Sequence, residues 1–309
     1  MSAVSGMSTK RKALLGLGIY FGIFILLLLI LGDEGKNEEF QPQNEFKLDA
    51  WIELKIGGID LSINKAVFYL LLASGLTIGA MTFIANRMRR EPNKVQMAVE
   101  LAYDLTRNNI TRGNIPDETL ARRWFPFLAG LFFFIWFSNM IGFLPLPINT
   151  EHKVDVFGLE LPSLALYAAT ANLSIPLVLT LVVWFSYHVE GVRAKGFFPY
   201  LASWLPPGLE SMNAAGKAFF FVIEAISHFA RLISLSVRLF ANILAGHLLL
   251  LFMGGGLAVL LGIAALASLT FPLAFAFFIL EVGLIATLQA FIFSTLTAIY
   301  LGGATAEAH

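Results

Sequence analysis

The chain has 309 residues, of which 57% are hydrophobic and 14% are charged, and its mean hydropathy is +0.75. A soluble chain carries roughly 25% charged residues, so this composition indicates an α-helical protein with several membrane spans rather than a soluble one. The formal net charge of zero gives no basic footprint for nucleic acid. The absence of cysteine excludes disulfides and thiolate metal sites and leaves the redox compartment open.

Residues 1–62 are predicted to hold one membrane span followed by an acidic external segment. Residues 13–31 are almost wholly apolar and follow three basic residues. This run is long for a signal peptide, and the residues after it make a poor cleavage site. We therefore predict a retained span rather than a signal-like segment. Residues 33–62 are polar and acidic, and residues 51–59 could form a short hairpin.

Residues 63–309 are predicted to form a membrane ion-channel domain. An amphipathic helix is expected over residues 91–109, on the membrane surface or against a partner. Three glycines mark the expected end of a long fifth segment. Apolar runs predict the remaining spans over residues 63–85, 124–146, 162–186 and 218–253, with a loop over residues 187–211.

The last apolar segment, residues 257–301, is longer than one crossing needs. As a single helix it would be ~67 Å long, against a hydrocarbon core of ~30 Å. It is therefore either two segments broken near Pro272 or one steeply tilted, bent helix. The predicted fold class is an all-α membrane protein with about six hydrophobic helices, and the distribution of basic loops places both termini inside.

The fifth segment carries polar side chains on one helical face. An arginine in the middle of a membrane helix costs roughly 2.5–3.5 kcal/mol on insertion scales, so Arg238 must either pair with a neighbouring acid and fix packing, or serve a function. His247 lies nine residues beyond Arg238, ~180° round the helix, and should contact a different neighbour. The face is defined by steps of four, three, four, three and four residues through Glu224, His228, Arg231, Leu235, Arg238 and Asn242.

An arginine in this place suits an electrostatic gate. Its guanidinium stays protonated, so it cannot shuttle protons, but it favours the ionised form of a carboxylate that passes it. Histidines and carboxylates can relay protons, and polar side chains can order water. The candidates for these two roles are Glu224, His228, His247, Glu281 and Gln289.

Two ordered motifs in the chain resemble a known family. The run Ser-Val-Arg-Leu-Phe-Ala-Asn-Ile-Leu-Ala-Gly-His at residues 236–247 is similar to the signature of subunit a of F-type ATP synthases. The run Thr-Leu-Gln-Ala-Phe-Ile-Phe-Ser-Thr-Leu-Thr-Ala-Ile-Tyr-Leu at residues 287–301 is similar to the last helix of that family. Asn139, Asn172 and Glu224 also match, and the resemblance covers about residues 50–301.

The resemblance implies a non-catalytic, proton-translocating stator subunit in which two long tilted helices pack against a rotating c-ring. Arg238 would face the ring carboxylate, with Asn242 and Gln289 as polar neighbours at that interface. Glu224, His247 and Gln289 would line two water-filled half-channels. His228, Glu281, Asn139 and Asn172 would lie on or near the proton path.

The resemblance also implies partners and a location. The partners would be the c-ring subunits, the peripheral stalk subunit b, other synthase subunits and the lipid membrane, without nucleic acid, metal or cofactor. We expect the inner membrane of a bacterium, because the sequence shows no amphipathic transit peptide, and an organelle membrane is the alternative. Whether protons or sodium ions are coupled stays open.

The chain departs from the family pattern at two positions. Family members with histidine at the position of His247 usually carry a carboxylate seven residues before the glutamine, where this chain has Val282. Glu281 is one residue earlier, and on a regular helix this offset turns its side chain by ~100° unless a local bulge realigns it. Thr170 replaces an aspartate found in some members, which weakens a relay role there.

Two other functions compete with this interpretation. A secondary transporter or channel acting alone would need a midplane site built from broken helices or internal repeats, and the sequence shows neither. A membrane metalloenzyme would have to use His188, His228, His247 and Glu224, but no tight ligand spacing such as HExxH is present.

Overall fold

The computed structural model describes residues 8–31, 48, 50–56, 59–60, 62–86, 93–143, 154–156, 159–161, 168–205, 212–263 and 265–306. Within these ranges, six helices are long and apolar enough to cross a membrane, and two of them span 48 and 41 residues. The predicted all-α membrane fold with two long helices is therefore confirmed. Most of the acidic segment and the basic cluster at Arg87, Arg89 and Arg90 lie outside the described residues.

The helices follow the chain as one separate span, a packed group and a long pair. The first five spans are formed by α1 (Thr9–Leu31), α2 (Lys65–Asn86), α4 (Glu118–Gly142), α5 (Ser174–Lys195) and α7 (Ala214–Leu251). The sixth combines α9 (Ala265–Leu280) with α10 (Ala286–Thr305). Between them lie α3 (Lys94–Asp104), η2 (Leu105–Arg112), η3 (Ala169–Ala171), α6 (Phe197–Ala202), η4 (Phe252–Gly256), α8 (Leu257–Leu261) and η5 (Glu281–Ile285).

Two small β-ribbons lie outside the helical body. Strand β1 (Ala50–Ile52) pairs antiparallel with β4 (Ile63–Asn64). Between them, β2 (Lys55–Ile56) pairs antiparallel with β3 (Ile59–Asp60). Strands are therefore present where the hairpin was predicted, but the pairing differs, because residues 50–52 pair with residues 63–64 rather than with residues 55–59. A second ribbon pairs β5 (Val154–Val156) with β6 (Leu159–Leu161).

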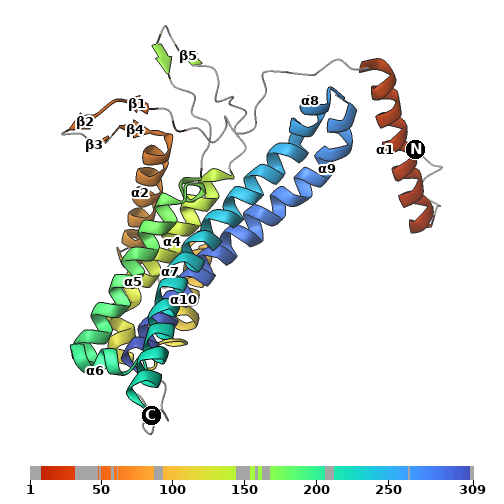
Figure 1. Ribbon diagram of the computed structural model, residues 1–309. Helices are drawn as coiled ribbons and strands as arrows, with labels where there is room; N and C mark the ends of the chain where they lie inside the picture. The colour runs from red at the N-terminus through yellow and green to blue at the C-terminus, as the bar shows by residue number, and fades with distance from the viewer. Residues whose placement is uncertain are drawn as a thin grey trace.

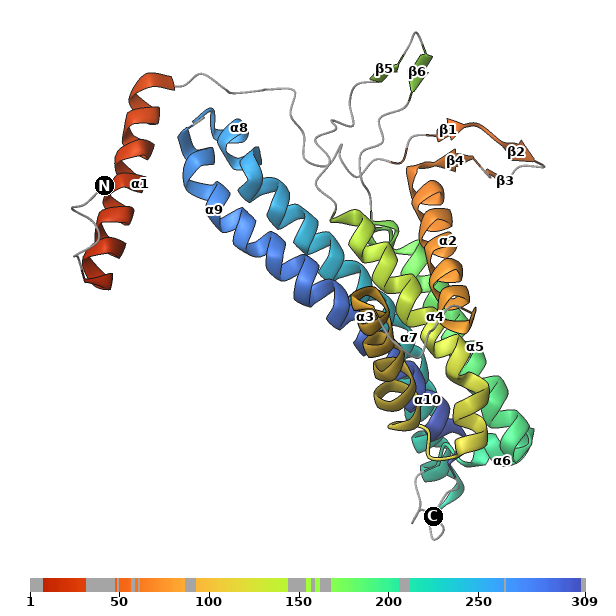
Figure 2. The same ribbon diagram turned by 180° about the vertical axis from the view of Figure 1, so that it is seen from behind.

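The long helices run side by side. In both views α7 lies antiparallel to α9 and α10 along its length, and the pair crosses α4 and α5 obliquely (Figures 1 and 2). The turn between them follows α8, where Gly262 has a φ of +71°, a left-handed conformation that suits glycine. The separate helix α1 lies beside α9, where the Tyr20 hydroxyl donates to the carbonyl oxygen of Ser268 at 2.9 Å.

The core lies where α10 packs against α4, α5 and α7. Leu128 and Ile135 of α4, Leu239 of α7, and Phe293 and Leu301 of α10 are all essentially buried. The outward faces of α1, α2 and α5 instead carry exposed apolar side chains, as lipid contact requires. This core fixes the spacing between α7 and α10, the two helices that carry most of the predicted site.

The last apolar segment is one unbroken helical run from Ala265 to Thr305 rather than two segments. Pro272 lies inside α9 and does not break it. The regular α-helical hydrogen bonding changes instead at η5, a π-helical turn between α9 and α10. The first residues predicted for this segment form α8 and belong to the preceding helix. The three glycines do not end that helix but kink it at η4, where Gly255 has a φ of +145°.

The predicted bounds of the fourth span are wrong at both ends. Helix α5 begins at Ser174 rather than near residue 162, because the Asn172 side chain accepts the Ser174 backbone N–H at 3.0 Å and caps the helix start. It continues through the expected loop to Lys195 and ends at Gly196, whose φ is +88°. Asn172 is therefore a capping residue outside the helix.

Gly142 is expected to be a sensitive packing position of α4. A Cβ added there would meet backbone and Cβ atoms of Ala168, which cannot move aside as a flexible side chain can. Overpacking of this kind typically costs about 1–3 kcal/mol, so Gly142→Ala should lower the temperature at which this subunit leaves the detergent-solubilised complex. Gly130→Ala on the same helix meets nothing within 4 Å and is the control. Equal thermal stability of the two variants would contradict the expected packing.

Candidate functional site

A cavity of about 530 Å³ opens beside the first half of α7. It is enclosed by α5, α6, α7 and α10, and Glu224, His228 and Arg231 contribute to its wall from α7. Aromatic side chains make up much of the remaining wall: Tyr187, Tyr200, Trp204 and Tyr300. The cavity therefore joins three of the polar residues on the predicted face to hydroxyl and indole groups of other elements.

Hydrogen bonds connect the polar groups of this cavity. The Arg231 Nη2 donates to the Glu224 Oε1 at 3.1 Å, and the His228 Nε2 lies 3.8 Å from the same oxygen. On the other side of the imidazole, the Tyr187 hydroxyl lies 3.0 Å from the His228 Nδ1. The guanidinium of Arg231 also lies over the Tyr300 ring, 5.6 Å from its centroid. Glu224, His228 and Tyr187 thus form a chain of groups that can donate and accept protons.

Tyr200 supplies a second hydroxyl from α6. It lies 2.6 Å from the Nδ1 of His188, whose ring centroid is 4.9 Å from that of His228. Burial raises the pKa of the Tyr200 phenol above its ordinary value, while a hydrogen bond with Trp204 and the charge of Arg231 act in the opposite direction. The phenol therefore stays protonated at neutral pH and can act as a hydrogen-bond donor.

The predicted polar face divides into two environments. Its first part, with His228 buried, lies against the cavity, whereas Arg238 and Asn242 are exposed further along α7. Leu235, on the same predicted face, is buried in the core. The division arises because α5 covers the first half of α7 but leaves the face with Arg238 open. The predicted helical spacing holds along α7, while the surroundings of the face differ between its two parts.

The face around Arg238 is open and consists largely of small side chains. Ser234, Ala241 and Ala245 are exposed on α7 beside Arg238 and Asn242. Within the described ranges, the Arg238 guanidinium forms no hydrogen bond or ion pair. A charge on an uncovered face of a membrane-spanning helix is costly in lipid.

His247 faces a different element from Arg238, as its position predicts. Its ring stacks on Phe143 at the end of α4, with centroids 4.7 Å apart and planes at 14°. Glu281 is buried and lies against Gly246 of α7, because a Cβ added to Gly246 would be 2.6 Å from both carboxylate oxygens. This second polar region therefore lies on α7 beyond Arg238, away from the cavity.

Asn139 and Gln289 are buried near the start of α10. The Asn139 Oδ1 accepts the Thr170 hydroxyl at 2.7 Å, and its Nδ2 donates to the Ala286 carbonyl at 3.5 Å. Gln289 is 5% exposed, one turn beyond Ala286. Asn139 and Thr170 thus hold the start of α10, whereas Asn172 caps α5 outside this group.

Sequence reasoning missed the aromatic members of the cavity. Tyr187, Tyr200 and Trp204 come from α5 and from the segment at and just after α6, a region where a loop was expected. Tyr300 lies within the matched motif of the last helix, and that was the available signal. His188 was considered only as a metal ligand. In the described ranges, no group of three His, Asp or Glu side chains is arranged to hold a metal ion.

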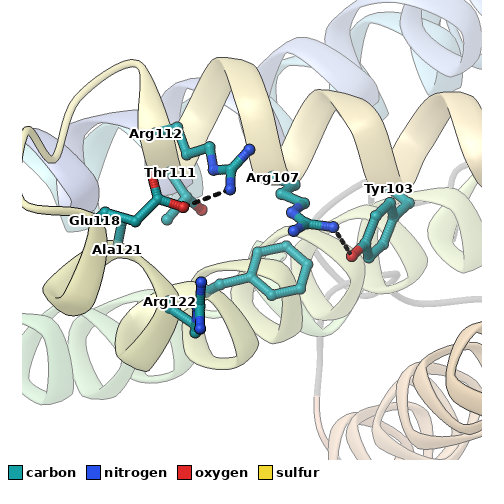
Figure 3. Close-up of a pocket in the computed structure, with 8 residues that line it drawn as sticks. Tyr103, Arg107, Thr111, Arg112, Glu118, Ala121 and Arg122 are labelled. Atoms are coloured by element: carbon teal, nitrogen blue, oxygen red, sulfur yellow. Dashed lines mark hydrogen bonds and ion pairs between the residues drawn. The ribbon is translucent and has the colours of Figure 1, made fainter.

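A second hollow, of about 210 Å³, lies between η2 and α4 (Figure 3). The Arg112 Nη2 donates to the Glu118 Oε1 at 2.6 Å, which ties η2 to the first turn of α4. The Arg107 Nη1 donates to the Tyr103 hydroxyl at 2.8 Å. Arg122 forms no such bond with any described residue. No predicted site residue lines this hollow.

Comparison with known proteins connects this arrangement to a family. Residues 67–302 match the family described as ATP synthase A chain. The ATP synthase subunit a of Rubrobacter xylanophilus is 34% identical over 254 residues, covering 82% of this chain and 88% of that protein. The subunit a of Campylobacter hominis is 36% identical over 238 residues, covering 77% and 88%. That of Beijerinckia indica is 30% identical over 277 residues, covering 88% and 98%. The matched region contains most of the cavity wall, the open face and the second polar region.

Proposed function

Because the chain belongs to the ATP synthase subunit a family, we propose that Arg238 is the fixed charge that separates two proton half-paths along α7. Membership makes the chain a multi-pass membrane protein and the proton-translocating stator subunit of the F-type ATP synthase membrane sector. It is not a catalytic subunit itself. Our proposal adds the roles of single residues, the contacts with partners and the particular membrane.

The uncovered guanidinium of Arg238 carries this proposal. No described acid of this chain neutralises it, and α7 presents it beside small side chains that allow another helix to approach closely. A ring of helices that each carry one carboxylate would cover this face and supply the missing negative charge. A transporter acting alone would have to leave the charge in lipid, so the open face favours the rotary function.

Polar groups lie on both sides of Arg238 along one continuous helix. Glu224 precedes it by 14 residues, ~21 Å at 1.5 Å per residue, and His247 follows it by nine residues, ~14 Å. A proton that enters through one region protonates a ring carboxylate. The carboxylate then travels nearly a full turn in its neutral form and releases the proton through the other region. The positive charge of Arg238 blocks the direct route between the two.

Each predicted residue takes a place in this scheme. Glu224 and His228 line the cavity at one end, and His247 and Glu281 form the second region, with Gln289 buried on α10 nearby. Asn242 is a polar neighbour of Arg238 on the open face. Asn139 holds α10 in place, and Asn172 acts only through the start of α5. The partners are the c-ring, the peripheral stalk subunit b and other synthase subunits, in the inner membrane of a bacterium.

Cysteine cross-linking tests whether the open face meets the rotor. The chain has no cysteine, so Ala241→Cys introduces its only thiol. Paired with a cysteine beside the carboxylate of the ring subunit, Ala241→Cys should yield a cross-linked product of the two subunits under mild oxidation. The control is Leu71→Cys. Leu71 is 61% exposed but lies on α2, so a cysteine there should give no cross-linked product. Cross-linking from residue 71 and not from residue 241 would overturn the proposal.

A further inference from the structure

We infer that the π-turn η5 positions the carboxylate of Glu281 on the face of the last helix that meets α7. On a regular helix this residue would point elsewhere. The inference rests on the proposed function, because it adds a positioning device to the second polar region. It assigns a role to two features that the family resemblance leaves unexplained: the turn at Glu281–Ile285 and the close approach of Glu281 to Gly246.

Buried positions mark one side of α9, η5 and α10. Ala274 follows Thr270 by four residues and Glu281 follows Ala274 by seven, two turns of an α-helix, whereas Ala286 follows Glu281 by five. A step of five also separates Ala265 from Thr270 at the start of α9, so the hydrogen bonding of η5 carries the argument. Five residues correspond to ~140° beyond a full turn on an α-helix. Here the backbone N–H of Ala286 donates to the carbonyl of Glu281, an i to i+5 bond, so the extra residue is absorbed within one wider turn. The buried face therefore continues through η5 as Thr270, Ala274, Glu281, Ala286, Gln289 and Phe293.

The wider turn returns Glu281 to the face of Gln289. On a regular helix, eight residues at ~100° each would place the two side chains ~80° apart, whereas seven steps place them only ~20° apart. Because the π-turn adds one residue with little added rotation, Glu281 takes the orientation of the position one residue later. Both side chains are buried, 6% and 5% exposed, as this alignment requires.

The α10 side of the turn is anchored to α4 by two hydrogen bonds. Asn139 donates to the carbonyl of Ala286, and the Trp136 Nε1 donates to the Thr287 hydroxyl at 3.1 Å. Ala286 and Ala290 are completely buried. In contrast, α9 is largely exposed along its outer side. If η5 became a regular α-helical turn without losing a residue, α9 and Glu281 would therefore rotate and α10 would keep its place.

Gly246 provides the room for the carboxylate on α7. A Cβ at this position would lie 2.6 Å from the two oxygens and from the Cδ of Glu281, closer than such atoms can approach. The next residue, His247, has a buried Nε2 that no described residue hydrogen-bonds, and the same holds for the Glu281 Oε2. Buried polar atoms are ordinarily paired. These two thus retain capacity to bind or pass on a proton, at adjacent places of the contact between α7 and η5.

A set of variants in the assembled synthase tests the positioning. The exchange Glu281→Val with Val282→Glu keeps the composition but moves the carboxylate to the neighbouring position. Since a misplacement of about 1 Å can cost roughly 100-fold in rate, ATP-driven proton pumping in membrane vesicles should fall by at least about tenfold. Deletion of Gly283 should instead preserve pumping, because it turns η5 into a regular turn with Glu281 and Ala286 four positions apart. Gly283→Ala, which meets nothing within 4 Å, is the control that keeps the residue count.

A second pair of variants keeps the test independent of the deletion. Gly246→Ala should displace the carboxylate and lower pumping, and adding the shorter Glu281→Asp should restore part of it. All rates are compared at equal amounts of assembled complex. Parent-like pumping by the exchanged variant, or by Gly246→Ala alone, would overturn the positioning role. So would a deletion variant that assembles but does not pump. Arg238→Ala in the same vesicles separates this inference from the proposed function. If Arg238→Ala abolishes pumping, these contrary results overturn only the positioning role of η5. If Arg238→Ala pumps, the proposed function is contradicted as well.

Discussion

Arg238→Ala is expected to abolish ATP-driven proton pumping while the synthase still assembles. Two unit charges 4 Å apart interact by about 4 kcal/mol at an effective dielectric constant of 20, which corresponds to roughly a 1000-fold change in an equilibrium. Without the guanidinium, a ring carboxylate beside α7 loses this preference for its ionised form. The electrostatic barrier between the two polar regions also disappears. Acidification of inverted membrane vesicles on addition of ATP measures the loss.

Arg238→Lys should fail as well, although it retains a basic side chain. A lysine in a dry environment can lose its proton, and a guanidinium cannot. The ammonium therefore gives no permanent barrier. Arg122→Ala is the matched control, because this arginine lies in the hollow of Figure 3, away from α7, and forms no bond with a described residue. Pumping by Arg238→Ala at the rate of the control would remove the gating role.

Assembly must be measured beside pumping. Arg238 is exposed and makes no contact that holds the described fold together, so its loss should leave the folded chain intact. A variant that fails to assemble would show instead that Arg238 contributes to the stability of the complex. The amount of this subunit in the purified synthase separates the two results.

The regular spacing of α7 was predictable, but its surroundings were not. The angle between Arg238 and His247 follows from one continuous helix, and in the structure His247 stacks on Phe143 while Arg238 lies on an open face. Which part of the polar face is covered depends on α5, and that packing is set by contacts remote in sequence. The sequence therefore indicated the residues of the face and could not show that His228 is enclosed while Arg238 is open.

Local backbone irregularities account for the remaining differences. The offset of Glu281 against Val282 is visible in the sequence, and a regular helix would leave Glu281 misaligned unless a local bulge is present. Its position at η5 depends on the anchoring of Ala286 by Asn139, a contact across 147 residues of chain. In the same way, the sequence suggests that Asn172 is a buried amide within the fourth span. In the structure its side chain instead caps the start of α5. Caps and π-turns are decided by single hydrogen bonds, which periodicity does not detect.

Glu224→Gln is expected to slow proton pumping by about tenfold or more. Positioned proton-transfer groups contribute roughly 100-fold or more to reaction rates, and water in a cavity of about 530 Å³ can replace part of a relay. The amide keeps the size of the side chain but cannot take up a proton, and it leaves Arg231 without its 3.1 Å carboxylate partner. Glu118→Gln breaks a comparable Arg–Glu pair at 2.6 Å outside the cavity and should leave pumping unchanged. Glu118 and Glu224 variants with equal pumping rates would show that the cavity does not carry protons.

The double variant Glu224→Gln with His228→Ala shows whether the two groups act in series or in parallel. If one path runs through both groups, the second substitution should cause no further loss of pumping. A larger loss in the double variant would show that Glu224 and the imidazole act as parallel relays.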